Sequence, residues 1–299
     1  MTAAAALAAA ALAAAAPTPE QIQALYDGAR ASGDMAAIRA AERLDHRPLH
    51  LRIPATLPRV PDRRAHPPGT PDARLSLALE RLGRSFDGWA AFWVHDLRTG
   101  RTAGWNSDAR FPAASTVKLA VVDAAVRRYG GRRRAAIDYD LRQIGSWSSN
   151  VAANRLYELV GSAETYASLA RLGMRSSTYT GPYRVGTSFD APKPPPLDTG
   201  RVTTAHDLGR ALYRLQRRRS PELRYLRLAW PGSSIIRGGL PAGTRVAEKD
   251  GWLEDMRASA AIAYLPRGPK IVVVLTYRPG LTRREARVLG RRVGLLATG

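Results

Sequence analysis

The spacing of apolar residues changes along this chain and predicts both helices and strands. Within 71–86, Leu75, Leu79 and Leu82 recur at helical spacing, which predicts an amphipathic helix. The next apolar run, 89–97, is nearly continuous, as in a buried strand, and the turn residues after it predict a hairpin with 101–106. One helix followed by two strands is therefore expected here.

The middle of the chain has helical patterns, and the last third returns to strands. Helical segments are predicted through residue 215, with a proline-rich loop at 178–200. Three strands and a final helix follow, predicted over 245–253, 259–265, 270–278 and 282–296. This order predicts an α+β fold with an antiparallel sheet of about five strands, flanked by terminal helices, and an inserted all-helical subdomain. A binding site is expected in the cleft between the two parts.

The segment before residue 71 has a different composition. Residues 1–16 are an alanine-rich apolar run, too short to cross a bilayer. Its small-residue ending predicts a signal peptide, although no basic residue precedes it, and an apolar N-terminal helix is the alternative. Residues 17–70 predict a helical segment and a proline-rich spacer, and 71–299 the main domain. We therefore expect a secreted or periplasmic protein of the cell envelope.

Charge and composition narrow the choice of partners. The formal net charge is +21, but the arginines are spread along the chain without a nucleic-acid-binding motif, so no nucleic-acid partner is expected. An arginine-rich coding background explains the charge, and affinity for anionic envelope polymers is the alternative. The absence of cysteine excludes disulfides and thiol catalysis, and the five histidines lack metal-ligand spacing. We expect a monomer with no metal and no cofactor.

Lysine is rare in this chain, and one lysine stands close to a serine. The four lysines are Lys118, Lys193, Lys249 and Lys270. Because arginine cannot lose its proton in a protein, a retained lysine indicates a specific role. In the stretch FPAASTVK, Ser115 and Lys118 are three residues apart where a helix is predicted to begin, so the amine can reach the hydroxyl. Ser115 is therefore either a nucleophile activated by Lys118, or a helix cap beside an exposed lysine.

Two further motifs follow in the chain. The stretch SWSSNVAAN places Ser148 and Asn150 at the start of a helical segment, where they form an S-x-N element or simply cap the helix. The stretch LPAGTRVAEKDGW leads Lys249 along a predicted strand to Gly251. A glycine at that position lets another backbone approach closely.

Together these stretches resemble the class A β-lactamases and the related penicillin-recognising serine transpeptidases and carboxypeptidases. That family carries S-x-x-K, S-D-N and K-T-G motifs in this order. The segment VTTAHDLGRAL at 202–212 also agrees, and the resemblance covers about 71–299. It implies the fold predicted above and a serine hydrolase acting on cyclic amides.

The resemblance implies catalytic roles for the serines and the first lysine. Ser115 would attack the carbonyl carbon of a β-lactam or a peptide and become acylated. Lys118 would accept the serine proton, directly or through a water. Ser148 would relay a proton to the departing nitrogen.

The same resemblance assigns the remaining site residues. Asn150 would orient the substrate amide and Lys118, and Lys249 would keep the field positive and so lower the pKa of Lys118. Backbone N–H groups of Ser115 and Trp252 would form an oxyanion hole. Substrate contacts are expected from the three residues that end the last motif: Asp250, Gly251 and Trp252.

The chain departs from the family pattern in the middle motif and in a loop. Ser149 replaces the aspartate of the S-D-N motif, and because this central position is variable in the family, the replacement hardly weakens the resemblance. In 173–199, where a lactamase carries a glutamate that activates the deacylating water, no glutamate occurs. Asp190 and Asp198 are the carboxylates of that stretch. Slow release of the acyl group is therefore expected.

A third departure is Asp250, where the family usually has threonine or serine. A carboxylate there would repel a substrate carboxylate unless it is protonated or paired. Either Asp250 shifts specificity toward a neutral or cationic group, or a neighbouring arginine such as Arg257 neutralises it.

These observations favour a serine hydrolase that is acylated on Ser115 by β-lactams or related amides. One alternative is a D,D-carboxypeptidase or transpeptidase-like enzyme acting on cell-wall peptides. The other is a binding module that no longer acylates and holds anionic wall polymers. Serine acylation itself needs no cofactor.

Overall fold

The computed structural model describes most of the main domain. The described residues are 70–131, 135–183, 201–253 and 255–299, together with Gln21, Ala24, Leu25, Gly28, Ala37 and Ala40. The predicted signal segment, most of 17–70 and the loop residues 184–200 lie outside the described residues.

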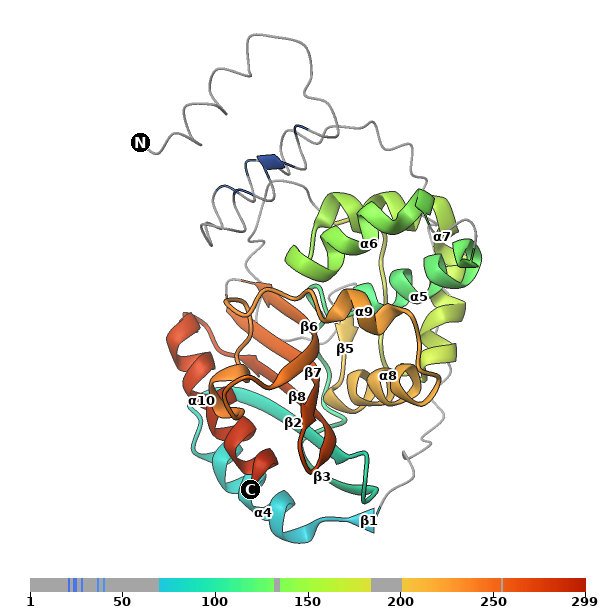
Figure 1. Cartoon of the computed structure of the whole chain (residues 1–299). Coiled ribbons are helices and arrows are strands. Elements are labelled where there is room, and N and C mark those ends of the chain that lie inside the picture. Colours follow the sequence, from blue (N-terminus) through green and yellow to red (C-terminus); the bar gives the residue numbers. More distant parts are fainter. Residues whose placement is uncertain are drawn as a thin grey trace.

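A six-stranded sheet forms the centre of the domain (Figure 1). Its strand order is β1-β3-β2-β8-β7-β6. The strands are β1 Thr70–Pro71, β2 Trp89–Asp96, β3 Arg101–Trp105, β6 Arg245–Leu253, β7 Met256–Leu265 and β8 Gly268–Tyr277. Strands β2 and β8 pair antiparallel from Trp89 and Tyr277 to Asp96 and Lys270, so the two ends of the chain meet at the centre of the sheet. The predicted α+β class is confirmed.

The prediction of about five antiparallel strands missed one strand of this sheet, and it also missed the two short strands of a second sheet described below. Strand β1 is two residues long and pairs parallel with β3, through Thr70 with Arg101 and Pro71 with Thr102. A strand this short shows no alternation of apolar and polar residues, and proline is a poor strand former. Only the tertiary structure places it at the edge of the sheet.

Seven helices and a short 3-10 turn surround the sheet in the part of the chain that the structure describes. They are α4 Ala73–Arg84, α5 Lys118–Tyr129, α6 Ala135–Trp147, α7 Asn150–Leu172, α8 Ala205–Arg217, α9 Glu222–Leu226, η3 Arg237–Gly239 and α10 Arg283–Thr298. Helices α4 and α10 cover one face of the sheet, and α8 covers the other, next to the helical part built by α5, α6 and α7 (Figure 1).

The central strands are buried on both faces, so their side chains divide between two cores. In β8, Ile271, Val273 and Leu275 pack toward the helical part, whereas Val272 and Val274 pack under α4 and α10. Successive side chains of a strand point to opposite faces, which explains this division. It also explains why the strand sequence is continuously apolar.

The terminal helices begin at capping residues that the predicted ranges included. The Asp72 carboxylate accepts a hydrogen bond from Leu75 N at 3.0 Å, and α4 follows. Thr282 and Glu285 form a reciprocal capping box at the start of α10. Each cap satisfies backbone N–H groups that have no partner within the helix.

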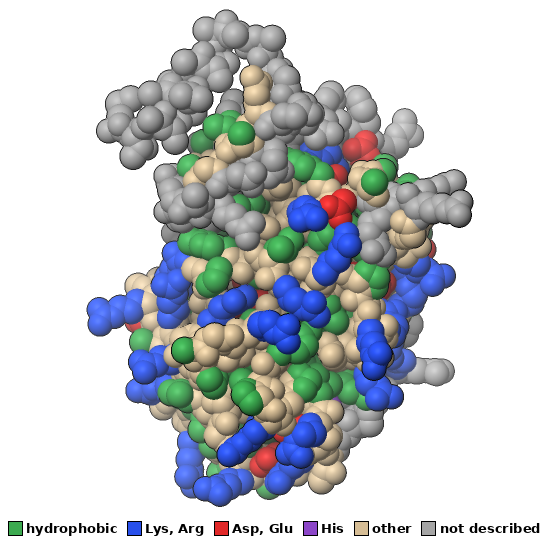
Figure 2. Space-filling view, viewed as in Figure 1, with side chains coloured by type: hydrophobic (Ala, Val, Ile, Leu, Met, Phe, Trp, Pro, Cys, Tyr) green, Lys and Arg blue, Asp and Glu red, His purple; other side chains and the backbone are tan. Residues whose placement is uncertain are grey.

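Basic side chains are scattered over the face shown in Figure 2, with acidic side chains at few points. On this face the positive charge is therefore not confined to one element. Of the helices in the described ranges, none combines the length and the apolar character needed to cross a membrane.

Candidate active site

Ser115 lies in a tight turn between strand β4, Phe111–Pro112, and helix α5. Strand β4 pairs with β5, Val202–Thr203, in a second, two-stranded sheet. Lys118 N donates to Ser115 O at 3.2 Å, so the two side chains start one turn apart, as predicted. Ala114, just before the serine, has φ 46°, a left-handed conformation that costs an alanine about 1–2 kcal/mol. The turn is therefore held in shape by its surroundings.

Strand β6 presses against this turn at a glycine. A Cβ on Gly251 would lie 2.9 Å from Thr116 Cγ2 and 3.2 Å from both Ala113 O and Ala114 Cβ. A side chain at 251 would push the strand away from the nucleophile. The predicted close backbone approach at Gly251 is confirmed.

Lys118 is completely buried at the start of α5. Its Nζ donates to Ser148 O at 2.5 Å and to Asn150 Oδ1 at 2.6 Å, and Ser148 Oγ lies at 3.4 Å. The first two motifs, separated by thirty residues in sequence, therefore meet at the lysine amine.

The Ser-Ser-Asn motif is the junction between α6 and α7. Ser148 follows the last residue of α6 with φ 63°, and its N–H donates to Ile144 O at 3.0 Å. Ser149 caps α7, because its Oγ accepts from Ala152 N at 3.2 Å. The helix-cap interpretation thus applies to Ser149, while Ser148 and Asn150 direct groups at Lys118.

Lys249 approaches the same serine from strand β6. It is 1% exposed, and its Nζ donates to Ser148 Oγ at 2.8 Å. It also donates to the carbonyl and carboxylate oxygens of Asp250, at 2.8 and 3.1 Å. Ser148 Oγ therefore lies within hydrogen-bonding distance of two buried lysine amines.

Asp250 is 6% exposed and pairs with Lys249. Burial raises the pKa of the Asp250 carboxyl, but the Lys249 charge and hydrogen bonds from Lys249 and Ser233 outweigh burial, so the pKa is lowered overall. Asp250 is therefore ionised at neutral pH. Arg257, the neutralising residue suggested from the sequence, donates instead to Met256 O at 2.8 Å and to Leu253 O, while its guanidinium carbon lies 6.0 Å from the Trp252 ring centroid.

Comparison with known proteins identifies the family. The model of the Beta-lactamase enzyme family matches residues 74–136 and 141–298. The chain belongs to this family. A β-lactamase of Bacillus licheniformis is 26% identical over 233 residues, which are 66% of this chain and 74% of that protein.

Two solved structures with low sequence identity show the same fold. PBP-A superposes with a TM-score of 0.64 at 20% identity, covering 78% of this chain and 97% of that chain. A mutant of PBP-A is known as an acyl-enzyme complex with penicillin G. A class A β-lactamase from Mycobacterium abscessus has a TM-score of 0.61 at 23% identity, covering 75% of this chain and 98% of the other.

Sequence patterns did not identify Tyr183 as part of this β-lactamase-like site. Its ring centroid lies 4.3 Å from Lys118 Nζ, and its hydroxyl donates to Ala114 O at 3.1 Å. Asn154 holds its backbone from helix α7. The only signal in the sequence was the position of Tyr183 within 173–199, the stretch in which a lactamase carries its glutamate.

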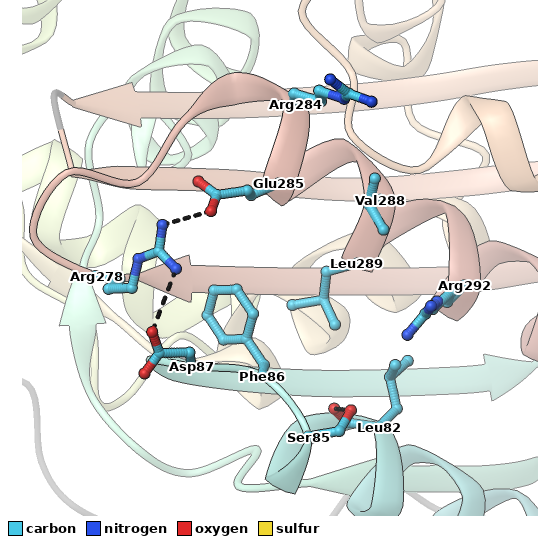
Figure 3. Close-up of a pocket in the computed structure, with 10 residues that line it drawn as sticks. All are labelled: Leu82, Ser85, Phe86, Asp87, Arg278, Arg284, Glu285, Val288, Leu289 and Arg292. Carbon is cyan, nitrogen blue, oxygen red and sulfur yellow. Dashed lines mark hydrogen bonds and ion pairs between the residues drawn. The ribbon is translucent and has the colours of Figure 1, made fainter.

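A pocket on the other side of the sheet belongs to different elements. It lies between α4 and α10, where Arg278 reaches both Glu285 at 2.7 Å and Asp87 at 3.6 Å (Figure 3). None of its lining residues belongs to the three motifs. Among the described residues, no three histidine, aspartate or glutamate side chains gather closely enough to hold a metal ion.

Proposed function

We propose that this β-lactamase family member is a serine hydrolase that is acylated on Ser115 by β-lactams or related amides and releases the acyl group slowly. The observation that carries the proposal is the position of Ser148 Oγ, 2.8 Å from Lys249 Nζ and 3.4 Å from Lys118 Nζ. Two buried amines that share one hydroxyl beside a serine turn form a path for a proton.

In the proposed acylation, the neutral Lys118 amine accepts the Ser115 proton. A neutral amine has two N–H bonds and one lone pair, and the acceptors at 2.5 and 2.6 Å, on Ser148 and Asn150, suit the two N–H bonds. The lone pair then takes the hydroxyl proton as Ser115 Oγ bonds to the substrate carbonyl carbon.

Collapse of this intermediate breaks the bond between the carbonyl carbon and the amide nitrogen. Ser148 donates its proton to the departing nitrogen, and the protonated Lys118 amine restores the Ser148 proton. Lys249 keeps a positive charge 2.8 Å from Ser148 Oγ and stabilises the oxyanion of Ser148 while the proton is in transit. The products are an acylated Ser115 and an amine, which stays attached to the acyl group when the substrate is a cyclic amide.

Labelling with a fluorescent penicillin tests acylation directly. The wild type is expected to carry covalent label that survives denaturation, and Ser115→Ala is expected to carry none. Equal labelling of the two proteins would place the nucleophile elsewhere. No labelling of the wild type by penicillins, cephalosporins or other acylating amides would contradict the proposed function.

A second candidate is a D,D-carboxypeptidase or transpeptidase-like reaction on cell-wall peptides. A mutant of PBP-A, which shares this fold, is known as an acyl-enzyme with penicillin G, and an acyl-enzyme on Ser115 would serve either reaction. The same acylation chemistry would then release a terminal D-alanine. Detection of D-alanine after incubation with a muropeptide, absent for Ser115→Ala, would support this reaction over β-lactam hydrolysis.

A further inference from the structure

Tyr183 occupies space directly beside the reactive amine. Its side chain is 8% exposed, and its ring centroid lies 4.3 Å from Lys118 Nζ. Its hydroxyl donates to Ala114 O at 3.1 Å, so it contacts the residue that precedes the nucleophile. One side chain thus borders both the expected base and the serine turn.

The contacts of Tyr183 fix it in this place. Asn154 Nδ2 donates to Tyr183 O at 2.8 Å, and Tyr183 N donates to Asn154 Oδ1 at 2.7 Å. The guanidinium carbon of Arg201 lies 4.0 Å from the ring centroid, and Tyr179 packs edge-on at 5.8 Å. A backbone held at both its donor and its acceptor, with a ring packed on its neighbours, has little freedom to swing away from Lys118.

The chemistry of this ring differs from that of a carboxylate. The ring packs against the Lys118 amine and limits its movement, and its face attracts that amine once acylation has protonated it. Burial raises the pKa of Tyr183 to about 12, although the Arg201 charge partly offsets this effect. The hydroxyl therefore stays protonated at neutral pH and cannot accept a proton from water.

We propose that Tyr183 is a positioning residue that sets the lifetime of the acyl-enzyme. Its ring holds the Lys118 amine against Ser148 and Asn150 for acylation. The same ring fills the space beside Lys118 that a hydrolytic water and its base would need. This inference rests on the proposed acylation of Ser115.

Fast release of the acyl group needs a base that can activate a water beside the ester. A carboxylate takes one proton from water as the water oxygen bonds to the ester carbonyl carbon. The bond from that carbon to Ser115 Oγ then breaks, and Oγ takes the proton back, which gives a free acid and the free serine. In Tyr183→Glu, the carboxylate would lie at about the depth of the present ring.

The test is a pulse of benzylpenicillin followed by removal of the excess and intact-mass measurement over time, which gives the rates of acylation and release separately. Tyr183→Glu is expected to shorten the adduct lifetime at least about tenfold, which is modest for a general base. Tyr183→Phe keeps the ring and is expected to retain the long lifetime. Tyr166→Phe is the matched control, because Tyr166 is another buried tyrosine of the helical part.

A second variant keeps the test decisive if Tyr183→Glu does not fold. Tyr183→Ala opens the space without supplying a base, so added formate is expected to shorten the adduct lifetime in this variant and not in the wild type. An unchanged adduct lifetime in Tyr183→Glu, or in Tyr183→Ala with formate, would overturn the role of Tyr183 and would leave the proposed acylation of Ser115 intact. Rapid wild-type turnover abolished by Asp190→Asn or Asp198→Asn would also overturn it. A wild type that never forms an adduct would overturn the proposed function, and this inference with it.

Discussion

The residues around Lys118 come from two kinds of structure. Ser148, Asn150 and Lys249 lie at a helix junction and in strand β6, where hydrogen bonds of 2.5–2.8 Å connect them through the two lysine amines. Tyr183 instead lies in the segment after α7 and meets Lys118 with its aromatic face. Ser148, Asn150 and Lys249 present proton donors and acceptors to the site, whereas Tyr183 presents to Lys118 a ring face that exchanges no protons.

The two sets of groups have different consequences for the two proposed steps, acylation of Ser115 and release of the acyl group. Acylation needs groups that exchange protons with Ser115 and with the departing nitrogen, and the helix junction and β6 supply them. Release needs a base that activates water, and a buried tyrosine with its pKa raised to about 12 does not supply one. With the proposed function, this site is expected to form a covalent adduct readily and to hold it.

The largest expected effect comes from removing the nucleophile. Ser115→Ala is expected to lower the rate of acylation by about 10⁴-fold or more, and Lys118→Arg by about 10²–10⁴-fold, because arginine cannot accept the proton. Rapid-quench labelling with benzylpenicillin measures both rates. Acylation of Lys118→Arg at the wild-type rate would show that another group is the base.

A smaller effect is expected from the lysine on β6. Lys249→Ala removes the cation next to Ser148 Oγ and is expected to slow acylation by about 10²–10³-fold, as for loss of one transition-state donor. Lys270→Ala is the matched control, because Lys270 lies 3.7 Å from Asp96 and contacts no motif residue. Equal effects of the two substitutions on acylation, with melting temperatures measured in parallel, would contradict the relay.

A change of about tenfold is expected at Asp250. Its ionised carboxylate pairs with Lys249, so Asp250→Thr removes a negative charge and leaves the Lys249 cation to attract a substrate carboxylate. The acylation rate is therefore expected to rise with benzylpenicillin and to stay nearly unchanged with its methyl ester. Second-order acylation rates for acid and ester give the comparison. A fall for both substrates would instead show that the pair with Lys249 organises the site.

The smallest effect is expected outside both groups, at the start of α10. The Thr282 hydroxyl and the Arg278 guanidinium lower the pKa of Glu285 to about 2. Because this pKa is 4.5 in the unfolded chain, the negative charge of Glu285 stabilises the fold fully at pH values above 4.5. Glu285→Gln is expected to lower the melting temperature slightly at neutral pH, and the difference should fade as the pH falls from 4.5 toward about 2. Acylation and release at neutral pH should not change. A changed release rate in Glu285→Gln would show that a loss of fold stability, without any change at the site, alters release of the acyl group.

The sequence was sufficient for parts of the fold and site in which local patterns and tertiary structure agree. Continuous apolar runs predicted β2 and β8, and the order of the elements predicted a sheet built from both ends of the chain. The three motifs predicted residues that the structure brings together around Ser148 Oγ. The sequence could not give the left-handed backbone at Ala114 and Ser148, because each depends on neighbours distant in the chain.

Other features required the folded chain for the same reason. Tyr183 reaches Lys118 only because Asn154, in α7, holds its backbone. Asp250 is adjacent to Lys249 in sequence, yet adjacent side chains of a strand normally point to opposite faces, so their pairing was not predicted.

Ready acylation of Ser115 and slow release of the acyl group can be measured together in a time course of intact mass after rapid mixing with benzylpenicillin. The wild type is expected to gain the mass of one benzylpenicillin per chain in a burst and then to return slowly to its original mass, and Ser115→Ala is expected to gain none. Hydrolysed penicillin that appears at many turnovers while no adduct accumulates would contradict slow release. A burst of equal size in Ser115→Ala would contradict the assignment of the nucleophile.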